Sequence, residues 1–151
     1  MKVLRILCKK LNKSDVKWVI GGSVSLALQG VDTEPHDVDI LTDEKGAYEL
    51  NKILKEYEIS KVKFSKTDII ASHFGKFKIN GFTVEVIGDY MLNMNGQWVN
   101  FGRKRINEII MLNVDDIEVP ISSLKSQLES SKIMGRTETV KKIEDVLTCV
   151  K

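Results

Sequence analysis

A glycine turn followed by two closely spaced aspartates constrains this sequence more than any other feature. The segment Gly21-Gly22-Ser23 follows the apolar run Trp18-Val19-Ile20, and fourteen residues separate Gly22 from Asp37-Val38-Asp39. This order predicts a strand, a glycine turn, a short helix and a second strand that carries both carboxylates. Successive side chains on a strand point to opposite faces, so Asp37 and Asp39 share one face.

The aspartate pair favours a bound cation. Two carboxylates roughly 6–7 Å apart on one strand face repel each other unless a cation lies between them. Oxygen ligands of this kind suit Mg²⁺, with Mn²⁺ as the alternative, and the metal completes its shell with water and phosphate oxygens. The other interpretation is a solvated strand end, but Val38, Ile40 and Leu41 indicate a strand that enters the core.

The glycine turn, Gly21, Gly22 and Ser23, is a candidate phosphate-binding element. It would place bare backbone amides at a helix start, where the partial positive charge favours phosphate. We expect Ser23 to cap a short helix that runs through Leu28 and stops at Gly30. An ordinary strand-to-helix turn is the alternative, and the residues alone do not separate the two.

Glu85 is the third acid of interest. It is the only charge in the run Phe82-Thr83-Val84-Glu85-Val86-Ile87. An ionised glutamate in a buried strand needs a partner, and a metal is one that could satisfy it. The alternative is an outward-facing glutamate on an edge strand.

Lys132 is a candidate ligand for phosphate. It continues, at i+4, the apolar row of Leu124 and Leu128 on an expected helix. A lysine at such a position either extends to solvent or meets an anion, and a triphosphate would be such an anion.

The remaining basic and histidine residues carry weaker signals. Arg103-Lys104-Arg105 is expected to form a solvated turn, and His73 to lie on a surface loop. Lysines and aromatic residues alternate over residues 61–66 and 74–78, a pattern that single-stranded nucleic acid can use. A net charge of +2 over 151 residues gives that interpretation little support.

Length and composition indicate one soluble globular domain over residues 1–151, with the C-terminal helices of residues 121–151 packed on the same core. Cys8 and Cys149 have no ligand-like spacing to a histidine, which favours reduced thiols and a cytoplasmic protein; a disulfide between them is the alternative. No signal peptide or membrane-spanning helix is expected, because the apolar runs are short.

The expected elements give an α/β (α+β) fold, with helices packed on a small mixed sheet. Helices are expected over an amphipathic N-terminus (Val3, Leu4, Leu7, Leu11), after Ser23, after Asp43 (Leu50, Ile53, Leu54, Tyr57), from Ser122 or Ser123 to Gly135, and from Thr137 (Val140, Ile143, Leu147, Val150). Strands are expected over 17–20, 36–41, 108–112 and 117–119, where Pro120 ends strand character, with a hairpin over 77–86 centred on Asn80-Gly81.

These elements together resemble the nucleotidyltransferases of the DNA polymerase beta superfamily, in particular its minimal bacterial and archaeal members. Residues 21–30 are similar to that family's opening helix motif, His36 to Ile40 to its metal-binding pair, and Val84-Glu85-Val86 to its third carboxylate. The segment from Leu124 through Lys132 to Gly135-Arg136 is similar to a closing segment. The sequence departs from the pattern at Asp32-Thr33-Glu34, where relatives often carry an arginine, and at Thr139, where an acid is expected.

The resemblance implies transfer of a nucleoside monophosphate from an NTP to an acceptor hydroxyl, with release of pyrophosphate. Asp37, Asp39 and Glu85 would hold the catalytic Mg²⁺, and the glycine turn with Lys132 would bind the nucleotide. Three hypotheses follow: a small-molecule acceptor such as an antibiotic, a protein or RNA acceptor in a toxin–antitoxin-like system, or a non-catalytic nucleotide- or RNA-binding module. DNA and membranes are not expected as partners.

Overall fold

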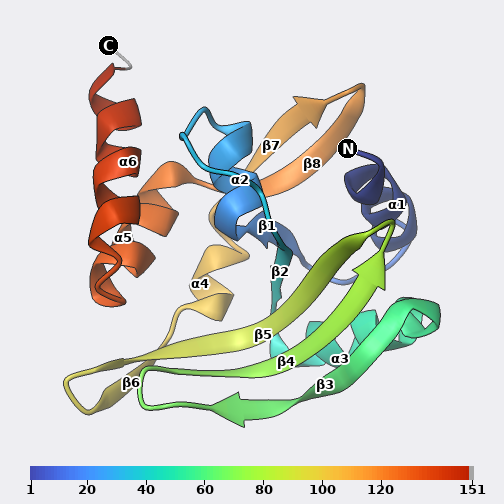
Figure 1. The fold of residues 1–151 in the computed structure, drawn as a ribbon. Coiled ribbons are helices and arrows are strands. Elements are labelled where there is room, and N and C mark those ends of the chain that lie inside the picture. Colours follow the sequence, from blue (N-terminus) through green and yellow to red (C-terminus); the bar gives the residue numbers. More distant parts are fainter. Residues whose placement is uncertain (150–151) are drawn as a thin grey trace.

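The computed structural model describes residues 1–149 and shows a mixed sheet with helices packed on it (Figure 1). Its elements, in chain order, are α1 (Lys2–Leu11), β1 (Val19–Gly21), α2 (Gly22–Leu28), β2 (Val38–Thr42), α3 (Glu44–Ile53), the 3₁₀ turn η1 (Lys55–Tyr57), β3 (Glu58–Lys66), β4 (Ile70–Ile79), β5 (Phe82–Met94), β6 (Gln97–Asn100), α4 (Gly102–Arg105), β7 (Ile109–Val114), β8 (Ile117–Ser122), α5 (Leu124–Ile133) and α6 (Thr137–Cys149). The expected α/β fold class is confirmed.

Strand β2 lies at the centre of the sheet. The strand order is β3-β4-β5-β2-β1-β8-β7, with β6 paired to β5. Strand β2 is antiparallel to β1 and parallel to β5. Val38 and Ile40 are fully buried on one face, as the alternation predicts, and Asp39 between them faces the other side.

The main hydrophobic core lies between the sheet and helices α1 and α3. Val3, Leu4, Leu7 and Leu11 of α1 are all buried there, which confirms the expected apolar face of the first helix. Asp43 caps α3, because its side chain accepts a hydrogen bond of 2.6 Å from the Gly46 amide.

The β4–β5 hairpin turns at Asn80-Gly81, as expected. Both residues have positive φ values, 52° and 83°, which a two-residue hairpin turn of this type requires. The strands extend well beyond the predicted 77–86 and form the long twisted ribbon at the bottom of Figure 1.

Pro120 does not end its strand, so that prediction is wrong. Strand β8 runs through it to Ser122 and pairs with both β7 and β1. Hydrogen-bonded and non-hydrogen-bonded pairs alternate from the two-residue turn at Asp115-Asp116. Pro120 lies opposite Met111 in a non-hydrogen-bonded pair, and the ladder to β7 therefore needs no N–H from it.

The two C-terminal helices pack on α2 through a hydrophobic cluster of their own. Its buried members are Leu26, Val31 and Ile143. Ser123, rather than Ser122, caps α5 by accepting a hydrogen bond of 3.1 Å from the Ser126 amide. The expectation for Val150 lies outside the described residues, and the single domain of residues 1–151 stays a prediction.

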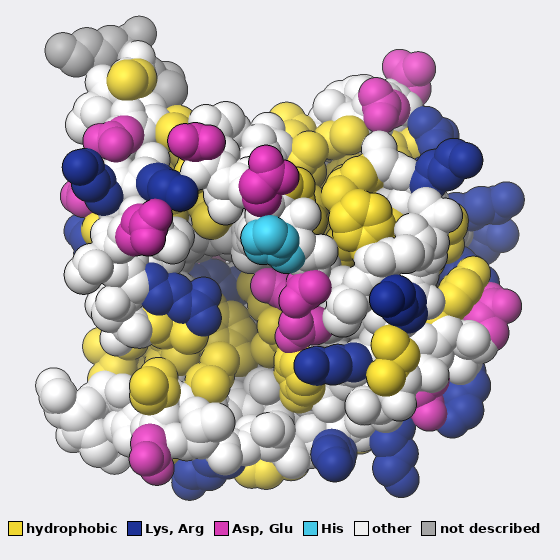
Figure 2. Space-filling model, viewed as in Figure 1, with side chains coloured by type: hydrophobic (Ala, Val, Ile, Leu, Met, Phe, Trp, Pro, Cys, Tyr) yellow, Lys and Arg dark blue, Asp and Glu magenta, His cyan; other side chains and the backbone are white. Residues whose placement is uncertain are grey.

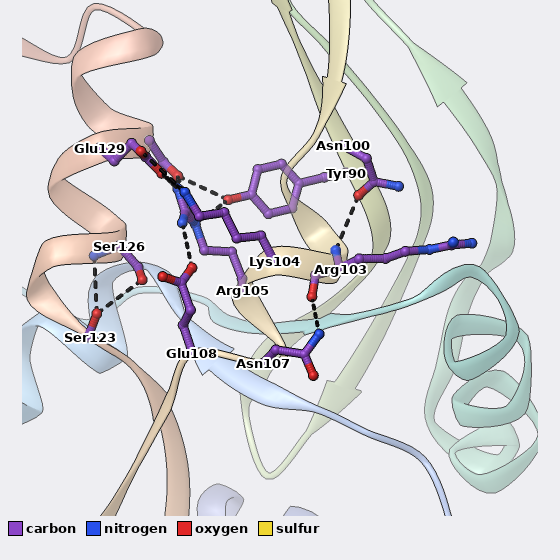
Figure 3. A network of polar contacts seen from close by, with 11 residues as sticks. Tyr90, Asn100, Arg103, Lys104, Arg105, Asn107, Glu108, Ser123, Ser126 and Glu129 are labelled. Carbon is purple, nitrogen blue, oxygen red and sulfur yellow. Dashed lines mark hydrogen bonds and ion pairs between the residues drawn. The ribbon is translucent and has the colours of Figure 1, made fainter.

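Arg105 anchors α4 to α5, and the expectation of a solvated turn at residues 103–105 is therefore wrong. Its side chain is only 1% exposed. The guanidinium donates to Glu129, at 2.7 Å (Figure 3), and to Ser130, at 2.8 Å. It also lies over the Phe101 ring. Arg103 is also paired, with Asp89. A buried arginine is satisfied here by partners 24 and 25 residues further along the chain.

The structure also bears on the expectations for His73 and for the two cysteines. His73 lies in β4 rather than in a loop, where its ring contacts Glu44 and Tyr48. Both cysteines are free thiols, Cys8 buried and Cys149 exposed. Over residues 1–149, no helix combines the length and the apolarity that crossing a membrane requires.

Candidate active site

Three acids from two neighbouring strands line one cavity. Strands β2 and β5 are paired in a register that sets Asp39 directly beside Glu85. Asp37 immediately precedes β2, and its carboxyl lies close enough to Glu85 to help raise the pKa of that residue. We call Asp37, Asp39 and Glu85 the acid cluster; all three line a cavity of about 540 Å³. Figure 2 shows acidic side chains gathered at the centre of this face, beside a hollow with hydrophobic and basic walls.

Burial and mutual repulsion make two of these acids hard to ionise. The pKa of Asp39 is raised to about 6, mainly by burial and then by the charge of Asp37, while Arg136 acts against the shift. Burial, followed by the charges of Asp39 and Asp37, raises the pKa of Glu85 to about 7. The site thus holds more negative charge than its own cations neutralise.

Thermal stability in EDTA should fall as the pH rises from 5 to 8. A carboxyl whose pKa is raised in the folded state contributes stability at low pH and loses it as the pH passes through the folded pKa, here about 6 for Asp39 and about 7 for Glu85. Acids whose pKa is lowered, such as Glu129 beside Arg105, act in the opposite sense at more acidic pH. Melting curves test this; Asp39→Asn should flatten the slope, and an equal slope in the variant would contradict the assignment.

Gly22 brings the glycine turn against the acid cluster. Its φ is +62°, a left-handed conformation that favours glycine. A Cβ atom at this position would collide with Oδ2 of Asp39. The helix α2 begins at Gly22, so the predicted N-cap role of Ser23 is wrong. Instead the Ser23 hydroxyl accepts a hydrogen bond of 3.3 Å from the His36 amide, which joins the glycine turn to the segment before β2.

The structure places Arg136, and not Lys132, at the cavity. Leu124 and Leu128 of α5 pack against the hydrophobic cluster that includes Ile143 of α6. Lys132, one helical turn further along α5, is exposed. Lys132 lines neither cavity of this site, whereas Arg136 lines both. The Gly135-Arg136 pair was part of the sequence resemblance, but only the turn between α5 and α6 shows which cation reaches the acids.

A second, smaller chamber of about 150 Å³ adjoins the first. It lies between Gly22, Asp39 and helix α5, and it contains two buried oxygens without a hydrogen-bond partner within residues 1–149, Oγ of Ser122 and Oε1 of Gln127. The amide of Gln127 donates to the Gly22 carbonyl at 3.1 Å. Nothing in the sequence pattern singles out these two residues, because their role depends on the packing of α5 against the turn.

The donor set fits Mg²⁺ in chemistry, although the protein does not supply a complete cage. In the part of the chain that the structure describes, no group of three His, Cys, Asp or Glu side chains is placed to hold a metal ion by itself. Mg²⁺ needs only one or two protein carboxylates, since water and substrate phosphates complete its shell. Asp37 and Asp39, crowded carboxylates on one wall of an open cavity, meet that requirement.

The fold and this arrangement of residues define a nucleotidyltransferase-like protein. One similar solved structure is TM1012 from Thermotoga maritima, a protein assigned as a nucleotidyltransferase. Its sequence is 36% identical to this one, the TM-score is 0.84, and the match covers 97% of this chain and 91% of that one.

A family model narrows the class further. The model for aminoglycoside-2''-adenylyltransferase matches residues 3–146, so the chain belongs to that family and is a nucleotidyltransferase. Comparison with curated protein sequences gives no match.

Two antibiotic-modifying enzymes share the fold. The lincosamide antibiotic adenylyltransferase LnuA, solved with lincomycin, is 13% identical with a TM-score of 0.61 and coverage of 96% of each chain. ANT(2'')-Ia, solved with adenylyl-2''-tobramycin, is 12% identical with a TM-score of 0.54, covering 97% of this chain and 92% of that one.

Proposed function

We propose that this protein catalyses Mg²⁺-dependent transfer of AMP from ATP to a hydroxyl of a small-molecule acceptor, with release of pyrophosphate. The observation that carries the proposal is the cavity in which the acid cluster faces the glycine turn and Arg136. The family's name supports an adenylyl donor. The two antibiotic-modifying relatives support a small acceptor, because they are solved with lincomycin and with adenylylated tobramycin.

Asp37 and Asp39 hold the metal in this proposal, and Glu85 completes the acidic wall. Bound Mg²⁺ supplies charge neutralisation at the triphosphate and lowers the pKa of the acceptor hydroxyl. Glu85 is also the residue placed to accept the hydroxyl proton, since it lines the cavity on the neighbouring strand to Asp39.

The glycine turn and Arg136 position the nucleotide phosphates. Gly22 and Ser23, at the start of α2, line the cavity, and the partial positive charge of backbone amides there would favour an anion. Arg136 lines the same cavity and stabilises the charge that develops on the leaving pyrophosphate. The protein thus contributes mainly positioning and electrostatics, as phosphoryl-group transfer requires.

Nucleotide binding and transfer should both depend on Asp39. Titration calorimetry of the purified chain with ATP and Mg²⁺ should give saturable binding, and EDTA should remove it. We expect Asp39→Asn to lower transfer from labelled ATP by at least about 100-fold, because a metal ligand is lost. Asp116→Asn, in the exposed β7–β8 turn, is the matched control and should retain activity.

The outcomes separate the competing hypotheses. Label in a protein or RNA fraction of a cell extract, with none in small molecules, would favour the macromolecular acceptor of a toxin–antitoxin-like system. Metal-dependent ATP binding without transfer to any fraction would favour a non-catalytic module. Full transfer activity in Asp39→Asn would contradict the proposed site.

A further inference from the structure

A basic surface extends from the acid cluster along β4 and β3. Phe74 and Glu85 both line the larger cavity, and Lys76 is the register partner of Glu85. Strand alternation sets Lys76 and Lys78 on the same face as Phe74. Lys63 of β3 is paired with Phe74 and therefore shares that face. We call Lys63, Lys76 and Lys78 the lysine surface.

The lysine surface is exposed, and the one acid that faces it is Glu85, the register partner of Lys76. All three side chains are exposed. None of them takes part in an ion pair among residues 1–149. The Nζ atom of Lys76 lies 5.9 Å from the centre of the Phe74 ring, beside the cavity. Unpaired cations next to an aromatic ring form a surface suited to an anionic ligand.

The lysine surface lies on the side from which the acceptor must approach. The proposed phosphate contacts, Gly22 and Arg136, lie on the β1 and α5–α6 side of β2, whereas Glu85 lies on the β5 side. The attacking and leaving oxygens are roughly in line in phosphoryl transfer. An acceptor opposite the leaving pyrophosphate therefore lies over β5 and β4, against Lys76.

An aminoglycoside would meet the wrong charge at this position. A polyamine acceptor needs carboxylates beyond those that hold the metal, and the only acids lining the larger cavity are the acid cluster itself. Asp32, Glu138 and Asp145 line a separate cavity beside α6.

We infer that the acceptor hydroxyl of this enzyme belongs to a phosphate-bearing molecule, whose phosphate is bound by Lys63 and Lys76. This inference rests on the proposed function and names its second substrate class. In the reaction the acceptor oxygen bonds to the α-phosphorus of ATP, the bond from that phosphorus to pyrophosphate breaks, and the hydroxyl proton passes to Glu85 or water. A phosphorylated small molecule and the end of a single-stranded RNA share the required chemistry.

The test uses phosphatase-treated acceptors. The full chain, Mg²⁺ and α-labelled ATP are incubated with the low-mass and RNA fractions of a cell extract. Each fraction is used with and without enzymatic pretreatment: phosphatase removes phosphate groups from the first, and nuclease cleaves the RNA of the second. Tobramycin is a third acceptor. We expect label in the untreated low-mass fraction and its loss after phosphatase. Label confined to untreated RNA would assign the phosphate to a polynucleotide instead.

Lysine variants test the surface itself. Lys63→Gln and Lys76→Gln should each raise the KM for the labelled fraction about tenfold, the worth of one charge-assisted phosphate contact, while the Kd for ATP stays unchanged. Lys52→Gln, an exposed lysine of α3, is the matched control and should change neither quantity.

Efficient labelling of tobramycin, or label that resists phosphatase and nuclease, would overturn the inference, whereas no labelled fraction at all would refute the transfer activity on which the inference depends. An unchanged KM in both lysine variants would also overturn the inference. Failure of ATP to bind would instead refute the proposed function on which the inference depends.

Discussion

Gly22→Ala should reduce AMP transfer by at least about 100-fold while the protein remains folded, because misplacement of a reacting group by about 1 Å costs this much. A methyl group at this position would collide with Oδ2 of Asp39, the central carboxylate of the acid cluster. The carboxylate must therefore turn away or the start of α2 must shift. Steady-state transfer from labelled ATP measures the loss, and circular dichroism reports the fold.

Gly30→Ala is the matched control for backbone strain. Gly30 also has a positive φ, +89°, but a Cβ atom there meets nothing within 4 Å. Both substitutions strain the backbone by roughly 1–3 kcal/mol, and only the one at Gly22 disturbs the carboxylate. Equal activity in the two variants would show that the contact between Gly22 and Asp39 does not position the acid.

Arg105→Met should destabilise the protein by about 1–3 kcal/mol, the usual effect of leaving buried polar groups without a hydrogen-bond partner, because the carboxylates it leaves behind are partly exposed. The guanidinium is 1% exposed and joins α4 to Glu129 and Ser130 of α5. Methionine keeps much of the volume but removes one hydrogen bond to the Tyr90 hydroxyl and the shortest one to the Glu129 carboxylate. Urea unfolding monitored by tryptophan fluorescence measures the change.

Lys104→Met separates burial from charge. Lys104 is adjacent in the chain and bonds to the same Glu129, at 3.2 Å, but its side chain is 50% exposed. An exposed ion pair is worth about 0–1 kcal/mol, so this variant should unfold almost as the parent does. A similar loss in both variants would mean that the charge of Glu129, rather than the buried network, governs stability.

Local patterns predicted the centre of the fold because they are short-range. The alternation around Val38 and Ile40 indicated a buried strand with acids on its other face, and both residues are fully buried. Asn80-Gly81 specified a turn by its backbone preferences alone. The pairing of Asp39 with Glu85 could not follow from such patterns, because it depends on the register of two strands separated by the whole β3–β4 ribbon.

The misassigned residues depend on distant contacts. Arg105 lies in a run of three basic residues, a pattern that predicts a solvated turn. The side chain is buried instead, because α5 packs against it and Ser130 accepts its hydrogen bond. Pro120 remains in a strand because its pair with Met111 needs no N–H. Lys132 and Arg136 are both plausible cations in sequence, and only the packing of α5 on α6 turns one outward and the other to the cavity.

The two halves of the site belong to separately supported units. The acid cluster is held by the pairing of β2 with β5, whereas Arg136 sits in the turn of a helix pair that rests on α2 through Ile143 and its neighbours. Under the proposed function, loosening that helix pair would therefore weaken nucleotide affinity more than metal affinity. Under the proposed function, exchange of residues 123–149 could alter the preferred donor only if the new helices still supply partners for the buried Arg105, as Glu129 and Ser130 do.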